Sequence, residues 1–137
     1  MIFVLVIDDW FPLLDHISHI LESKGDIVVE KSLSFDEALE KLNSISFDVI
    51  VMDYKSNKPV AIDVLQQIRL KGIATPVVLF SWGQYCGIEH EVNQYGGVVI
   101  VPKSPEFVLC IDELEETVRT IIETIGCNLS ANGRGGT

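Results

Sequence analysis

The chain has 137 residues, a length that fits one ordinary domain and leaves little room for a second. Hydrophobic residues make up 47% and charged residues 22%, which is typical of a globular protein and excludes a disordered one. Ten basic residues against twenty acidic ones give a net charge of −10, and such a surface is repelled by phosphate backbones and by anionic lipid. We therefore expect no direct binding to nucleic acid or to membranes.

The apolar and cysteine patterns predict a cytoplasmic protein. The longest apolar stretch, at residues 1–7, is too short to span a bilayer and lacks the basic flank and cleavage site of a signal peptide. The cysteines are widely spaced and form neither a CxxC pair nor a zinc pattern with the histidines, so we expect reduced thiols. These cysteines are Cys86, Cys110 and Cys127.

Five apolar runs predict β-strands. They cover Ile2–Ile7 and residues 27–31, 49–52, 76–80 and 98–101. Four of them carry Val, Ile and Leu at consecutive positions, which is typical of strands buried on both faces of a parallel sheet. The run at 27–31 is shorter and more polar, so we expect it at an edge of the sheet.

The segments between the runs show helical spacing. A first helix over about 13–21 ends before Gly25, and a second begins at Ser34, with Glu37 completing a capping box. The others are predicted over about 64–70, weakly over 89–94, and over about 105–125 with an end at Gly126. Five β-α units in order predict an α/β fold, a doubly wound parallel sheet with helices on both faces. We assign residues 1–126 to this domain and the polar, Gly-rich residues 127–137 to a flexible tail or linker stub.

Polar residues follow four of the five predicted strands. They are Asp8 with Asp9, Asp53, Ser81 and Lys103. In open α/β sheets, ligands bind at the carboxyl ends of the strands, so these side chains are candidates for one site.

The chemistry of these residues favours phosphoryl transfer. Three converging carboxylates, Asp8, Asp9 and Asp53, would repel one another, and a hard cation such as Mg²⁺ resolves that repulsion. A carboxylate beside such a cation is a plausible nucleophile toward a phosphoryl group. Lys103 can then neutralise the phosphoryl oxygens and Ser81 can donate a hydrogen bond to them.

Each residue also has a simpler interpretation. Asp8 and Asp9 could cap the first helix, Asp53 could belong to a turn, and Lys103 could be an ordinary surface lysine. Only the combination on four strand ends in the right order favours a functional pocket.

These residues resemble the signature of the receiver domain of two-component response regulators. Asp53 follows Asp8 by 45 positions and Lys103 follows Ser81 by 22, both typical of that family, and the resemblance covers about residues 1–125. It implies a flavodoxin-like sheet in the order 2-1-3-4-5, a Mg²⁺ site formed by Asp8, Asp9 and Asp53, and phosphorylation on Asp53. Ser81 and Lys103 would contact the phosphoryl group.

The resemblance also implies partners. A histidine kinase or a phosphotransfer protein would supply the phosphoryl group, and a downstream protein or an output domain would respond to a change near the fourth helix and fifth strand. The last helix and its neighbours would form a homodimer face. Such a domain is no enzyme beyond self-phosphorylation and slow self-dephosphorylation at Asp53.

Several positions depart from the family pattern. Ile100 stands where an aromatic switch residue is usual, and Ser104 stands where a proline usually follows the lysine. Trp82 replaces a small residue, and we hypothesise that its bulk, together with Lys55, slows self-dephosphorylation. The alternative is a degenerate receiver that serves as a phosphorylation-independent scaffold. A haloacid-type phosphatase and a flavodoxin lack support, because the second Asp of the former and the phosphate loop of the latter are missing.

Overall fold

The structure is a computed structural model that describes the backbone of residues 1–54, 60–82, 96–103 and 106–136. Side chains are described at 1–52, 62–80, 96–102, 106 and 110–124. The elements in chain order are β1 (Ile2–Ile7), α1 (Phe11–Glu22), β2 (Ile27–Ser32), α2 (Phe35–Ser44), β3 (Val49–Tyr54), α3 (Val60–Leu70), β4 (Val77–Trp82), β5 (Val98–Lys103) and α5 (Phe107–Gly136).

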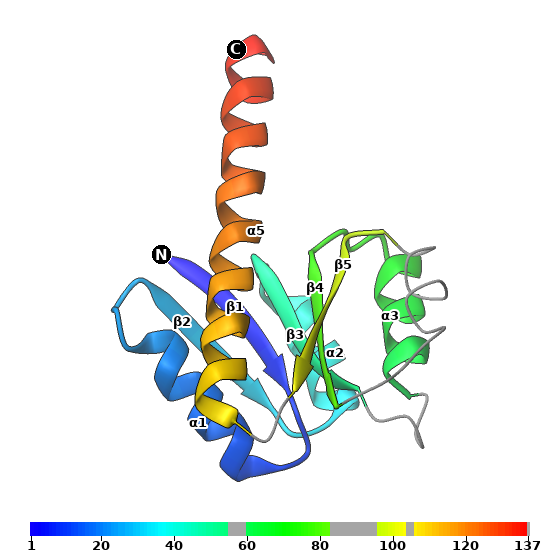
Figure 1. Ribbon diagram of the computed structural model, residues 1–137. Helices are drawn as coiled ribbons and strands as arrows, with labels where there is room; N and C mark the ends of the chain where they lie inside the picture. The colour runs from blue at the N-terminus through cyan, green and yellow to red at the C-terminus, as the bar shows by residue number, and fades with distance from the viewer. Residues whose placement is uncertain (55–59, 83–95, 104–105, 137) are drawn as a thin grey trace.

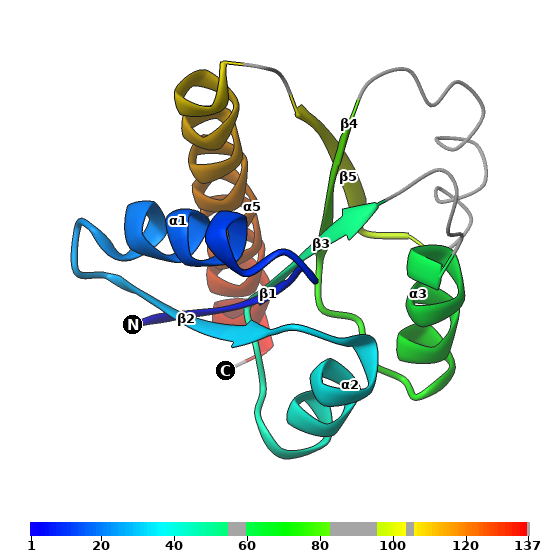
Figure 2. The same cartoon turned by 90° about the horizontal axis from the view of Figure 1, so that it is seen from below.

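The five strands form one parallel sheet in the order β2-β1-β3-β4-β5. Figures 1 and 2 show α1 and α5 on one face of this sheet and α2 and α3 on the other. The predicted α/β fold, its strand order and the edge position of β2 are confirmed. The weak helix expected over 89–94 lies outside the described residues.

Two apolar cores lie on the two faces of the sheet, because alternate side chains of a strand point in opposite directions. Val4 and Val6 of β1 pack toward α1 and α5, in a cluster that includes Leu14 and Leu114. Leu5 and Ile7 point the other way, toward α2 and α3. Burial of both faces is why the strands read as continuous apolar runs in the sequence.

The predicted start of α2 at Ser34 is confirmed, although the Glu37 side chain forms an ion pair with Lys41 at 3.1 Å. Ser34 is the N-cap residue, and its hydroxyl accepts the Glu37 N–H at 3.2 Å. The predicted helix stop at Gly25 is also confirmed, and Gly25 and Gly72 both adopt φ near +80° just after α1 and α3.

The expected end of the last helix is wrong. We placed it at Gly126, whereas α5 continues to Gly136 and its C-terminal part extends past the amino edge of the sheet (Figure 1). A glycine inside a helix costs only about 1 kcal/mol, which does not force an end, and no proline follows it. The division into residues 1–126 and 127–137 stays a prediction.

Side chains from both neighbouring helices block the free edge of β2. Glu22 of α1 accepts the Val29 N–H at 3.2 Å, and the Lys41 ammonium of α2 donates to the carbonyl of Lys31. An open strand edge invites pairing with another chain, so these contacts protect the sheet from edge-to-edge association.

Arg69 ties α3 to the amino edge of β4 and β5. Its guanidinium donates to the carbonyls of Ile73 at 2.8 Å, Thr75 at 2.9 Å and Gly96 at 3.0 Å. The rigid fork of an arginine can serve several acceptors at once, which the single ammonium of a lysine cannot do with the same geometry.

We therefore expect Arg69→Ala to lower the free energy of unfolding by about 2 kcal/mol, since charged hydrogen bonds are lost and backbone carbonyls lose their donor. Arg69→Lys should recover only part of that loss. Urea denaturation measures both. Lys71→Ala is the matched control, because the Lys71 ammonium makes a single long contact with the described side chains, to Asn43 at 3.4 Å on the surface. Equal stability of Arg69→Ala and Lys71→Ala would contradict the role given to Arg69.

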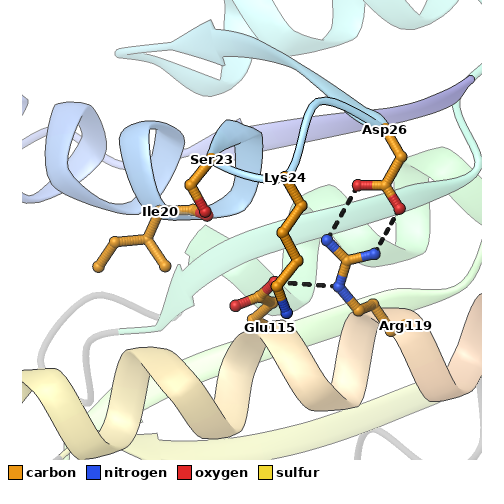
Figure 3. Close-up of polar contacts among 6 residues, drawn as sticks. All are labelled: Ile20, Ser23, Lys24, Asp26, Glu115 and Arg119. Atoms are coloured by element: carbon orange, nitrogen blue, oxygen red, sulfur yellow. Dashed lines mark hydrogen bonds and ion pairs between the residues drawn. The ribbon is translucent and has the colours of Figure 1, made fainter.

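A second polar network joins α5 to the loop between α1 and β2 (Figure 3). Arg119 donates two hydrogen bonds to the carboxylate of Asp26, at 2.6 and 3.0 Å, and a third to Glu115 at 3.0 Å. Lys24 of the same loop forms an ion pair with Glu115 at 3.2 Å. The network fixes the middle of α5 against the amino edge of the sheet.

The charges in this network shift one another's pKa values. The hydrogen bond from Arg119 lowers the pKa of Asp26. Partial burial acts to raise the pKa of Glu115, but the hydrogen bonds from Arg119 and Lys24 outweigh it, so this pKa is also lowered. The hydrogen bond with Asp26 raises the pKa of Arg119, which keeps the guanidinium charged.

Lowered carboxyl pKa values stabilise the fold above the unfolded value of about 4, and this contribution is lost as the pH falls through the folded values. The melting temperature of Arg119→Ala should therefore lie below that of the wild type at pH 7. The gap should shrink as the pH falls below about 4. Calorimetry across this range measures it, with Asp26→Asn as a second variant that removes the titrating group. A gap that stays constant down to acid pH would show that Arg119 contributes packing and not charge.

Candidate functional site

The backbone register brings the predicted site residues to one edge of the sheet. Ile7 of β1 pairs with Met52 of β3. The residue that follows each of them is an aspartate, Asp8 directly after β1 and Asp53 within β3. On the far side of β3, Tyr54 pairs with Ser81. All strands run in the same direction, so these positions share the carboxyl edge (Figure 1).

The same edge includes the end of β5, where Lys103 pairs with Trp82 of β4. The structure therefore places the backbone of each sequence-predicted residue at the carboxyl edge. The side chains of Asp53, Ser81 and Lys103 lie outside the described ones, so their roles stay predictions. Asp8 and Asp9 are described in full.

Asp8 is held in a defined position at this edge. Its side chain is only 4% exposed. Its N–H donates to the carbonyl of Ser32 at 3.1 Å, and its Oδ1 accepts the Trp10 N–H at 2.9 Å. This bond to a backbone N–H two residues on forms an Asx turn that carries the chain from β1 into α1.

The alternative interpretation, that the acid pair caps α1, is wrong. The N-cap residue is Trp10, its side chain makes no capping hydrogen bond, and the first turn of α1 contains no acidic residue. Asp8 is buried at the edge of the sheet, and the adjacent Asp9 is exposed. Neither aspartate is therefore the N-cap residue, and Asp8 makes a local Asx-turn bond just before α1.

The donor chemistry fits a hard cation. Carboxylate oxygens are the ligands that Mg²⁺ prefers, and a buried carboxylate needs a cation or strong donors to offset its desolvation. Among the described side chains, no group of three or more His, Cys, Asp or Glu residues lies together. Asp8 and Asp9 belong to that part of the chain, whereas the side chain of Asp53, the third predicted ligand, does not.

An exposed apolar surface borders the acid pair, and the sequence interpretation missed it. Trp10 and Phe11 are about half exposed, and a shallow groove of about 180 Å³ is lined by Trp10, Pro12, Leu13 and His16. The Lys31 ammonium lies over the Phe11 ring, 5.7 Å from its centroid. Two aromatic residues directly after the acid pair were the available signal in the sequence.

The positions that depart from the family pattern are only partly described. Ile100 is partly buried and packs against the core on the α2 and α3 face. Trp82 ends β4, but its side chain is outside the described ones, and Lys55 lies outside the described residues altogether.

In the part of the chain that the structure describes, no helix is both long and apolar enough to cross a membrane.

A five-stranded parallel sheet with an acid pair after β1 and an aspartate at the end of β3 defines the receiver class of α/β proteins. The family model of the response regulator receiver domain matches residues 4–124. The chain therefore belongs to the response regulator receiver domain family. No curated protein sequence matches it.

Solved structures agree with this assignment. The receiver domain of the Francisella response regulator 1452 is 26% identical, with a TM-score of 0.77 over 91% of this chain and 99% of that one. The response regulator domain of Thermotoga maritima CheB is 28% identical, with a TM-score of 0.77 over 90% and 97%. TrrA from Thermotoga maritima, a response regulator in complex with Mg²⁺ and BeF, is 23% identical, with a TM-score of 0.72 over 88% and 99%.

Proposed function

We propose that this receiver domain is a working phosphoacceptor that takes a phosphoryl group onto Asp53 from a histidine kinase or a phosphotransfer protein. The single observation that supports this most is the register of β1 with β3. It sets the buried Asp8 beside the strand position of Asp53 at the carboxyl edge. The Asx turn of Asp8 alone would not need that register.

In the proposed reaction, a carboxylate oxygen of Asp53 attacks the phosphorus atom of a phosphohistidine. A new O–P bond forms and the N–P bond breaks, and the histidine leaves as a neutral imidazole because its other ring nitrogen already carries a proton. Lys103 neutralises the charge on the phosphoryl oxygens, and Ser81 donates a hydrogen bond to them. Asp8 and Asp9, together with Asp53, would hold a Mg²⁺ ion, which supplies further neutralisation of that charge when bound.

The structure of TrrA supports the metal part of the proposal, since that protein was studied in complex with Mg²⁺ and BeF. Asp8 is also suited to a metal site, because its Oδ1 accepts the Trp10 N–H and its own N–H donates to the carbonyl of Ser32, and these two bonds hold the residue in place. We propose further that the domain acts in the cytoplasm, and that phosphorylation changes its binding to a downstream protein or an output domain. Turnover beyond self-phosphorylation and slow self-dephosphorylation is not part of the proposed activity.

The degenerate-scaffold alternative draws its support from Ile100. Isoleucine packs on the core and has no aromatic ring, so it cannot act as a switch that moves between buried and exposed positions. Under this alternative the domain would bind its partner without any phosphoryl group. The two functions differ in whether Asp53 reacts at all.

Incubation with acetyl phosphate and Mg²⁺, followed by intact-protein mass spectrometry, separates the two functions. We expect one added phosphoryl group on the wild type and none on Asp53→Asn, because only the carboxylate can form the acyl phosphate. Chelation of the cation should abolish the adduct. No adduct on the wild type, together with unchanged tryptophan fluorescence on titration with beryllofluoride and Mg²⁺, would favour the scaffold.

Trp82 should govern how long the phosphoryl group stays on Asp53. Trp82 ends β4 one residue after Ser81, and we propose that its bulk shields the entrance to the site. We expect Trp82→Ala to lose the phosphoryl group several-fold faster than the wild type, because water reaches the phosphorus atom more easily. Lys55→Ala, which removes the charge and a thinner, more flexible side chain than the indole of Trp82, should have a smaller effect. Decay of the phosphorylated mass measures both, and an unchanged rate in Trp82→Ala would contradict the shielding role.

A further inference from the structure

The backbone of Trp10 is bonded both to the acid pair and to α1. Its N–H donates to Oδ1 of Asp8 at 2.9 Å, and its carbonyl accepts the Leu14 N–H at 3.2 Å. Leu14 is fully buried and packs in the core on the α1 and α5 face of the sheet. A continuous path of backbone hydrogen bonds therefore joins the carboxylate of Asp8 to the buried side of α1.

This path begins at a helix start that has no side-chain cap. Trp10 is the N-cap residue in an extended conformation, and its side chain makes no capping hydrogen bond. Pro12, in the first turn, has no N–H to donate. The start of α1 thus lacks the hydroxyl cap that Ser34 gives to α2, and the bond to Asp8 satisfies the Trp10 N–H instead. The order of this helix start therefore depends on where the Asp8 carboxylate is held.

The same bond acts on the carboxylate. An ionised carboxylate has about four positions at which it can accept a bond, so a single N–H leaves room for a cation. A donor to a metal-binding carboxylate fixes the orientation of that ligand, and its loss typically costs about 10- to 100-fold in metal affinity. Asp8 is buried and accepts this bond within its own turn, so the Trp10 N–H has the position of such a donor.

We propose that the Trp10 N–H couples cation binding at the acid pair to the order of the first turn of α1. The N–H orients Asp8 for the cation, and a bound cation holds Asp8 so that its bond to Trp10 opens less often. Thermodynamic linkage makes these two effects reciprocal. Trp10 and Phe11 are half-exposed at this turn, so the cation also fixes the aromatic surface beside the site. This inference rests on the proposed function, because it requires that the acid pair bind Mg²⁺.

Two substitutions at one position separate the N–H from the indole. Trp10→Pro removes the N–H, whereas Trp10→Ala removes the ring and keeps the N–H. The dissociation constant for Mg²⁺, followed by the NMR shift of the Asp53 amide, should be about tenfold higher in Trp10→Pro than in Trp10→Ala. The constant of Trp10→Ala should stay close to that of the wild type. Equal Mg²⁺ affinity of the two variants would overturn the proposal.

A second measurement uses the wild type, because a proline prefers φ near −65° and Trp10 has φ −102°. Amide hydrogen exchange at Trp10 should be about tenfold slower in saturating Mg²⁺ than in EDTA, as reciprocity requires. The Ile45 amide is the matched control, since it donates to the carbonyl of Lys41 at 2.8 Å at the far end of α2 and should exchange at the same rate in both. No slowing at Trp10, or equal slowing at Ile45, would overturn the coupling.

Failure of this proposal is distinguishable from failure of the proposed function. If only the coupling is wrong, the wild type still binds Mg²⁺ and accepts a phosphoryl group on Asp53, and exchange at Trp10 does not respond. A wild type in which Mg²⁺ shifts no amide at the carboxyl edge would overturn both.

Discussion

The parallel register of β1, β3, β4 and β5 is the constraint on which the rest of this structure depends. A parallel sheet delivers all its strand ends to one edge, so residues far apart in the sequence meet there. Burial on both faces fixes the register, because a slip of one residue would turn every apolar side chain of a strand to the wrong face. The same apolar packing that stabilises the fold therefore also sets the spacing of the acidic site.

The two edges of the sheet are built differently. At the amino edge, Arg69 and Arg119 join helices to strands and loops through several hydrogen bonds each. At the carboxyl edge, the buried carboxylate of Asp8 lies at the end of β1, beside the end of β3. We interpret the first edge as the rigid base of the domain.

Much of the fold could be predicted from the sequence because its signals are local. Consecutive Val and Ile residues predict strands buried on both faces, and Ser34 with Glu37 predicts a helix start. The end of α5 could not be predicted in the same way, since the free-energy cost of Gly126 in a helix is smaller than the effects that decide where a helix ends. The acid pair was found from its place after a strand, but whether Asp8 caps a helix or forms an Asx turn depends on the chain path around it.

The central claim, that the strand register gathers Asp8, Asp9 and Asp53 around one cation, is tested most directly by paramagnetic NMR. Mn²⁺ accepts the same oxygen ligands as Mg²⁺ and broadens amide signals close to it. Titration of the ¹⁵N-labelled protein should broaden the amides of Asp8, Asp9 and Asp53 together, at low Mn²⁺ concentration, and leave those of Ile2 and Val77 at the amino edge sharp. Broadening at the end of one strand alone, or spread evenly over the acidic surface, would contradict the account.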